Sequence, residues 1–129
     1  MILDSSALVT VILAEPGFED VLTRMGEATA LGVGAPTIAE AAIVLSARLR
    51  RDARALLNEL LREAEVEIIP CGAEHYSAAV TAYQKFGKGR HRAALNFGDC
   101  LAYAVAELSG LPLLFTGSDF SKTDIQSAL

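Results

Sequence analysis

Four acidic residues stand at points in the sequence where an apolar strand ends or a helix begins. Asp4 follows the apolar run 1–3, Asp119 follows the apolar run 113–116, and Glu40 and Asp99 lie close to predicted helix starts. In a parallel sheet the carboxyl ends of the strands share one edge, and ligands bind at that edge. The sequence therefore predicts that these four carboxylates converge there.

Carboxylates that converge in a partly desolvated site repel one another unless a cation or a shared proton relieves the repulsion. A divalent cation is the natural solution, and all the candidate ligands are oxygen atoms. Neither His75 nor His91 stands at a zinc-like spacing, so the sequence favours Mg²⁺ or Mn²⁺ over zinc or copper. A site of this kind suits the hydrolysis of phosphodiester bonds.

Each acid, taken alone, also has a structural explanation. Residues 37–40 (TIAE) match a capping box that would use Glu40, and Asp99 can interact with a helix dipole. Asp119 can form an Asx-turn, and Asp4 precedes a helix that Ser5 or Ser6 could cap. Only the predicted convergence of the four favours a functional site over four separate caps.

The elements that must position these acids follow from hydrophobic periodicity and from glycine and proline breaks. Strands are predicted over 1–3, 30–34, 66–69 and 113–116, with helices between them, which gives an α/β layered fold around a small parallel sheet. The helix faces expected to be buried carry Ile38, Ala42, Leu45 and Leu49 in one helix, Tyr76, Ala79, Val80 and Tyr83 in another, and Leu101, Val105 and Leu108 in the last.

Composition narrows the class of protein. The chain has 129 residues, 52% of them hydrophobic and 21% charged, which predicts one folded domain over residues 1–129 and excludes disorder. No apolar run is long enough to span a bilayer, and no basic leader precedes Asp4. Cys71 and Cys100 form no metal-ligand or redox spacing, so a reducing, cytoplasmic compartment is expected.

Four segments resemble, in order and spacing, the acidic motifs of the PIN-domain family, and most closely those of its VapC toxins. They are residues 1–8 (MILDSSAL), 37–40 (TIAE), 95–103 (LNFGDCLAY) and 115–120 (FTGSDF). The resemblance covers essentially the whole chain, and the segment 96–99 (NFGD) is far more specific than any isolated acid.

The resemblance implies a three-layer α/β/α domain with a mainly parallel sheet of four to five strands. It also implies a Mg²⁺- or Mn²⁺-dependent endoribonuclease toxin that is inhibited by a VapB-like antitoxin and forms a homodimer, to which helices before residue 65 could contribute. In this interpretation the matching acids Asp4, Glu40, Asp99 and Asp119 form the metal site. Asp4 and Asp99 are the expected direct ligands, and Glu40 and Asp119 act through waters or on a second ion.

Polar residues beside the matching acids also fit the family, with two departures. Ser6 and Thr116 match polar positions next to the metal site. Ser5 stands where threonine is common in the family, and Ser118 stands where asparagine or aspartate is frequent. Both departures keep a polar side chain and leave the predicted metal site intact.

A basic loop precedes the Asp99 helix. Four of the 11 basic residues fall within residues 85–92, whereas the whole chain carries a net charge of −5 and cannot attract a polyanion by bulk charge. Two glycines allow the loop to curve toward the acids, so we expect Lys88, Arg90 and Arg92 to contact RNA phosphates. A solvated loop is the alternative. Most Phe and Tyr residues are expected in the core, which leaves few aromatics for base stacking.

Three other functions are compatible with parts of this pattern. A metal-dependent DNA nuclease shares nearly all of the chemistry, and a non-catalytic PIN-like interaction module would use the acids only as helix caps. A haloacid-dehalogenase-like phosphatase also places an aspartate after its first strand, but it needs a second acid where Ser6 stands. The presence of all four motif acids favours the nuclease.

Overall fold

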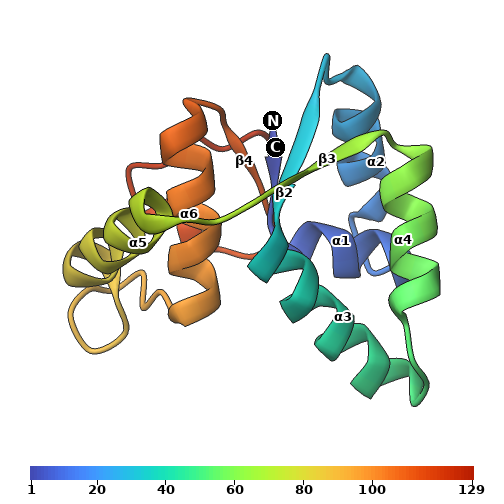
Figure 1. Cartoon of the computed structure of the whole chain (residues 1–129), viewed down its shortest axis with the longest axis horizontal. Helices are drawn as coiled ribbons and strands as arrows, with labels where there is room; N and C mark the ends of the chain where they lie inside the picture. Colours follow the sequence, from blue (N-terminus) through green and yellow to red (C-terminus); the bar gives the residue numbers. More distant parts are fainter.

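The computed structural model describes all of residues 1–129 and has the predicted three-layer α/β/α architecture (Figure 1). Its sheet contains four strands, all paired in parallel, in the order β3-β2-β1-β4. The strands are β1 (Ile2–Leu3), β2 (Leu31–Gly34), β3 (Val66–Ile69) and β4 (Leu113–Leu114). The predicted parallel sheet is therefore confirmed.

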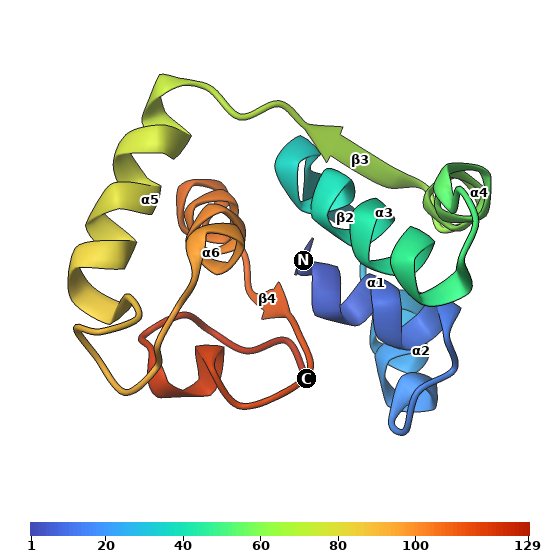
Figure 2. The same ribbon diagram turned by 90° about the horizontal axis from the view of Figure 1, so that it is seen from below.

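The helices form two unequal groups, one on each side of the sheet, as both views show (Figures 1 and 2). One group contains α1 (Ser5–Ile12), α2 (Phe18–Glu27), α3 (Ala35–Leu49) and α4 (Arg54–Glu63). The other contains α5 (Ala73–Phe86) and α6 (Phe97–Ser109), which pack closely against each other. A short 3₁₀ helix, η1 (Phe120–Lys122), follows β4.

The two central strands divide their side chains between two cores because successive residues of a strand point to opposite faces. Ile2 and Leu113 are paired across β1 and β4 and belong to the core under α5 and α6. Leu3 and Leu114 form the next pair and belong to the core under α1–α4. All four are fully buried, so two-residue strands are enough to anchor both helical layers.

Gly34 at the end of β2 allows α6 to approach the sheet. A Cβ atom at this position would lie 2.9 Å from Cγ2 of Val105 in α6, closer than side chains normally pack. The absence of a side chain there lets α6 lie against the middle of the sheet. This contact fixes the helix whose first turn carries Asp99.

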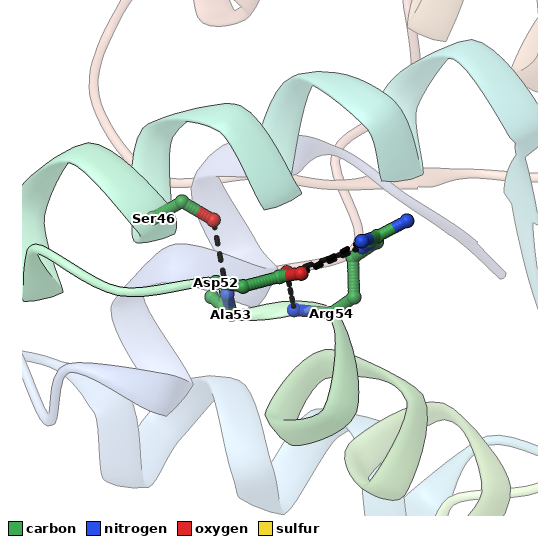
Figure 3. Close-up of polar contacts among 4 residues, drawn as sticks. All are labelled: Ser46, Asp52, Ala53 and Arg54. Atoms are coloured by element: carbon green, nitrogen blue, oxygen red, sulfur yellow. Dashed lines mark hydrogen bonds and ion pairs between the residues drawn. The ribbon is translucent and has the colours of Figure 1, made fainter.

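Polar contacts over a short range hold the turn between α3 and α4 (Figure 3). Ser46 Oγ accepts a hydrogen bond from the Ala53 N–H at 3.0 Å, and Asp52 Oδ1 accepts one from the Arg54 N–H at 3.0 Å. The Asp52 carboxylate also pairs with the Arg54 guanidinium at 2.7 Å. These hydrogen bonds from Arg54 lower the pKa of Asp52 to about 2.

The start of α3 differs from the prediction. The helix begins at Ala35 with Pro36 in its first turn and Gly34 as its N-cap, so residues 37–40 lie inside the helix and form no capping box. Proline fits the first turn because it has no N–H to leave unpaired. As a result, Thr37 is buried and the Glu40 carboxylate is free for another role.

The predicted inner faces of two other helices are partly wrong. On α5 the buried residues are Ala79 and Ala82, whereas Tyr76, Val80 and Tyr83 are exposed. On α6 Val105 is buried as predicted, but Leu108 is 45% exposed. Small residues carry most of the contact on these helices, and a pattern based on large apolar residues does not detect them.

No helix is long and apolar enough to cross a membrane. Both cysteines are free: Cys100 is buried in α6, and Cys71 is partly buried in the segment before α5.

The core under α3 yields a test of this packing. Leu45 is completely buried, while Ile43 on the same helix is 71% exposed. We expect Leu45→Ala to lower the free energy of unfolding by about 2–5 kcal/mol, because it removes buried methyl groups and leaves a cavity. Ile43→Ala is the matched control and should change the free energy of unfolding by less than about 0.5 kcal/mol. Urea denaturation measures both, and equal losses would contradict the fold described here.

Candidate active site

The four predicted acids line one cavity of about 440 Å³, formed where α1, α3 and α6 begin and where the chain leaves β4. Asp4 is the residue between β1 and α1, Glu40 lies in the second turn of α3, Asp99 in the first turn of α6, and Asp119 just before η1. Ser6 and Thr116 line the same cavity. Segments more than 100 residues apart thus contribute to one surface.

Asp4 is held in place by a chain of hydrogen bonds. Its Oδ2 atom accepts hydrogen bonds from the Ser6 backbone N–H at 3.0 Å and from the Ser6 hydroxyl at 2.5 Å, so Asp4 caps α1. The Ser6 hydroxyl accepts in turn from the Thr116 N–H at 3.0 Å. Thr116 Oγ1 lies 3.2 Å from the buried hydroxyl of Thr10. This chain ties the segment after β4 to α1.

The other oxygen of Asp4 has no partner. Asp4 is only 3% exposed, and its Oδ1 atom is buried without any hydrogen bond. Burial raises the pKa of Asp4, the negative charge of Glu40 raises it further, and the hydrogen bonds from Ser6 oppose both effects. A buried carboxylate oxygen without a donor is a costly feature that a bound cation would satisfy. The residues present therefore fit a divalent ion.

Asp99 caps its own helix together with Asn96. The Asp99 carboxylate accepts a hydrogen bond from the Asn96 N–H at 3.0 Å, and the Asn96 side chain accepts one from the Asp99 N–H at 2.9 Å. Burial raises the pKa of Asp99 to about 6, and the negative charges of Asp4, Glu40 and Asp119 add to this rise. Burial is thus the main cause of the raised pKa of Asp99, and the neighbouring carboxylates add a smaller electrostatic contribution.

Glu40 occupies space that Gly98 leaves free. Its carboxylate accepts a hydrogen bond from the Ser5 hydroxyl. A Cβ atom at position 98 would overlap that carboxylate, and it would lie 2.7 Å from the Glu40 Cδ atom. Gly98 does not have a left-handed backbone conformation, so this position needs glycine for space and not for its conformational freedom.

The acids surround a cavity and do not form a compact chelate. No three histidine, cysteine or carboxylate side chains are grouped closely enough to hold a metal ion by themselves. Asp119 is exposed at the rim, whereas Asp4 lies deep in the site. Mg²⁺ commonly binds through one or two carboxylates and keeps several water or phosphate oxygens as ligands. This arrangement suits such an ion better than zinc.

The explanation of the acids as helix caps accounts for only two of them. Asp4 and Asp99 do cap α1 and α6. Glu40 lies inside α3, and Asp119 makes no side-chain capping hydrogen bond to η1. Half of the cluster therefore needs an explanation other than helix capping.

The basic loop lies outside the cavity. Lys88, Arg90 and Arg92 are exposed and none of them lines the acidic surface. The loop is closed at its base, where the Lys88 N–H donates to the Leu95 carbonyl at 2.9 Å. Arg90 extends over the ring of Tyr83, with its guanidinium carbon 5.8 Å from the ring centroid. The structure does not bring these cations into contact with the four acids.

Three polar residues of the site have no specific role in the sequence-based prediction, although Ser5 and Asn96 lie within the motif segments. Asn96 and Ser5 line the cavity and bond to Asp99 and Glu40, and Thr10 lies behind Thr116. The spacing of Asn96 and Asp99 is itself a capping pattern, so it could have been found from the sequence. Nothing in the sequence marks Thr10, because its hydroxyl is buried within a helix that is otherwise apolar.

Comparison with known proteins identifies the family. Residues 1–126 match the family model described as the PIN domain. The chain belongs to the PIN-domain family. Curated relatives of this PIN domain include ribonuclease VapC36 of Mycobacterium tuberculosis, which is 43% identical over 98% of this chain and 91% of that protein. A VapC ribonuclease of Mycolicibacterium smegmatis is 38% identical over 97% of each chain.

Solved structures agree on the fold of this PIN domain. The crystal structure of the Mycobacterium tuberculosis toxin VapC20, which is described as cleaving the sarcin-ricin loop, matches with a TM-score of 0.79 at 13% identity, over 96% of this chain and 95% of that one. A chain of a toxin-antitoxin complex from Klebsiella pneumoniae matches with a TM-score of 0.69 at 16% identity, over 95% of this chain and 92% of that one. At these identities the likeness shows the shared fold.

The raised pKa of Asp99 predicts a specific pH dependence in the metal-free PIN domain. The pKa is about 6 in the folded state and 3.8 in a free side chain. Protonated Asp99 therefore favours folding, and this contribution is lost as the pH rises from about 4 through about 6. Asp99→Asn removes the charge and keeps an acceptor for the Asn96 N–H. We expect the free energy of unfolding of Asp99→Asn to exceed that of the parent chain by about 1 kcal/mol at about pH 7 and to differ little from it at about pH 4. The value at about pH 7 is reduced because the carboxyl group is partly exposed to solvent.

Denaturation in the presence of a chelator measures this difference. Glu59→Gln, at an exposed position in the interior of α4, is the control for loss of one negative charge and should change the free energy of unfolding by less than about 0.5 kcal/mol. An Asp99→Asn effect that does not change between the two pH values would contradict the electrostatic description of the cavity.

Proposed function

We propose that this PIN domain is a Mg²⁺- or Mn²⁺-dependent endoribonuclease of the VapC toxin type, which hydrolyses phosphodiester bonds of RNA. The observation that carries the proposal is the buried Asp4 Oδ1 atom, which has no partner in a cavity shared with three more carboxylates. The names of relatives at 33–43% identity, all ribonucleases, support RNA as the substrate over DNA.

The side chains take different roles in this proposal. Asp4 and Asp99 bind the ion directly, while Glu40 and Asp119 act through waters or on a second ion. Ser6 and Asn96 orient Asp4 and Asp99 through the hydrogen bonds already described. A divalent ion bound here lowers the pKa of a water molecule and offsets the negative charge of the phosphate. The four acids alone would repel the substrate.

The basic loop supplies attraction for RNA in this proposal. The chain has a net charge of −5, so long-range attraction of a polyanion must come from a local patch. Lys88, Arg90 and Arg92 form such a patch on the loop that leads into α6. Because they lie outside the acidic cavity, they are placed to bind phosphates that flank the cleaved bond and not the reacting phosphate itself.

A VapB-like antitoxin is the proposed regulatory partner, since an uncontrolled cytoplasmic ribonuclease would damage its own cell. An Arg or Lys side chain of such a partner would pair with the four acids and compete with metal and RNA. A second cavity of about 470 Å³ between α2 and α4, lined by Leu22, Met25 and Leu60 among others, offers a place for an apolar helix of the partner. The homodimer implied by the family resemblance stays a prediction.

The decisive test is cleavage of single-stranded RNA by the purified protein. We expect hydrolysis with Mg²⁺ or Mn²⁺, none with a chelator, and a loss of at least about a hundredfold in Asp99→Asn, because the amide keeps the shape but not the charge that binds metal. Asp20→Asn is the matched control and should cleave like the parent chain. Gel analysis of the products measures each rate.

The same assay separates the alternatives. Cleavage of single-stranded DNA without cleavage of RNA would favour the DNA nuclease. Inactivity toward both, together with no rise in melting temperature when Mg²⁺ or Mn²⁺ is added, would favour the non-catalytic module, because an ion that binds only the folded state raises that temperature.

The basic loop has its own prediction. We expect Arg90→Ala combined with Arg92→Ala to weaken RNA binding and to reduce by about 1 the slope of log affinity against log salt concentration, since phosphate contacts release counterions. Arg51→Ala with Arg62→Ala removes the same charge from exposed positions elsewhere. If both pairs change the slope equally, the loop is only a solvated surface.

A further inference from the structure

An apolar groove lies between α5 and α6, lined by α6 residues other than those that line the acidic cavity. It has a volume of about 440 Å³ and is lined only by apolar side chains of α5 and α6. Tyr76 and Tyr83 border it on α5, Phe97 and Leu101 border it on α6, and the small side chains of Ala79 and Cys100 lie between them. Figure 1 shows these two helices side by side, joined by the basic loop at one end.

Three of the chain's aromatic side chains are exposed at this groove, whereas Tyr103, Phe115 and Phe120 lie in the core as expected. Phe97 is 80% exposed, Tyr76 is 69% exposed and Tyr83 is 40% exposed. Three aromatic side chains around one groove are an unusual concentration in a chain with five phenylalanines, three tyrosines and no tryptophan. Such exposed apolar surface indicates a binding site.

The groove adjoins both parts of the proposed RNA site. Phe97 stands between Asn96, which lines the acidic cavity, and Gly98, which makes room for Glu40. Both cavities thus use residues of the first turn of α6, on different faces of that helix. A short extended stretch of single-stranded RNA can reach from one to the other.

Positive charge borders the groove beside Tyr83. The guanidinium of Arg90 lies over the ring of Tyr83, and the Tyr83 hydroxyl donates a hydrogen bond to the Lys88 carbonyl at 3.2 Å. Aromatic faces beside Arg and Lys are the combination by which proteins hold single-stranded nucleic acid: the rings stack on bases and the cations bind phosphates. A second copy of this chain in the groove would instead place another basic loop beside this one, and the like charges would repel each other.

We propose that this groove binds an unstacked base of the RNA substrate near the cleaved phosphate, with Phe97 as the stacking surface. The inference rests on the proposed ribonuclease function and adds a binding subsite to it. It makes Phe97 a substrate-binding residue outside the metal site. Because every base has an aromatic face, the groove contributes affinity and position for any base.

The test compares side chains at position 97 in the Asp99→Asn background, which prevents cleavage during the measurement. Phe97→Leu keeps an apolar side chain but removes the flat ring, and Phe97→Trp keeps a ring. We expect Phe97→Leu to weaken binding of a mixed-sequence single-stranded RNA about tenfold, and Phe97→Trp to bind within about threefold of the parent. Leu111→Ala, at an exposed residue beyond the other end of α6, is the control and should bind like the parent.

Two further readouts identify the occupant of the groove. RNA that carries the fluorescent base 2-aminopurine should change its fluorescence on binding to the chain with Phe97 and change it much less with Phe97→Leu, because the base exchanges stacking on its neighbours for stacking on the ring. Sedimentation velocity measures the oligomeric state of each variant. A dimer that dissociates on Phe97→Leu would assign the groove to a second copy of the chain and overturn the proposal.

The outcomes separate this inference from the function on which it rests. Cleavage is compared between the parent chain and Phe97→Leu made without Asp99→Asn. If both cleave RNA equally well, and Phe97→Leu in the Asp99→Asn background binds RNA as well as that background does, the ribonuclease stands and the stacking site is wrong. If the parent chain binds RNA through Phe97 but never cleaves it, the groove stands and the nuclease is wrong. No RNA binding by the parent chain overturns both.

Discussion

Electrostatic repulsion among four carboxylates is the constraint on which the site depends. Unpaired negative charges in a partly buried cavity destabilise the folded chain, and burial first and the neighbouring carboxylates second raise the pKa values of Asp4 and Asp99. The sheet must be stable enough to offset this destabilisation. The fully buried residue pairs between β1 and β4 provide that stability directly beneath the site. The same repulsion becomes useful once a cation is present, because it favours binding of positive charge.

Local hydrogen bonds solve the problem of keeping repelling groups in place. Ser6 holds Asp4, Asn96 holds Asp99, and the Ser5 hydroxyl bonds to Glu40. Ser6 and Asn96 lie within three residues of the acids that they hold, whereas Ser5 is 35 residues from Glu40 and links α1 to α3. The geometry of the cavity therefore depends on the ends of α1 and α6, where backbone N–H groups are available, and not on long flexible side chains.

The sequence predicts the sheet well because short apolar runs and breaks define its strands, and the four acids do line one cavity as expected. The role of these acids in binding metal stays a prediction. The sequence predicts the surroundings of α5 and α6 poorly. Periodicity shows that Tyr76 and Tyr83 share a face, but it cannot show whether another element covers that face. In this chain none does. The capping-box pattern at Thr37 also misleads, because Pro36 can begin a helix earlier than a four-residue motif indicates.

The acidic site is sensitive to substitution of Gly98, which carries no charge itself. Any side chain at this position would compete with the Glu40 carboxylate for the same space, although the backbone there could accept any residue. A genetic screen for chains that have lost their activity should therefore recover substitutions at Gly98 as well as at the acids. Such substitutions leave all four acids in the sequence. A search for the motif acids alone would therefore classify these inactive chains as active enzymes.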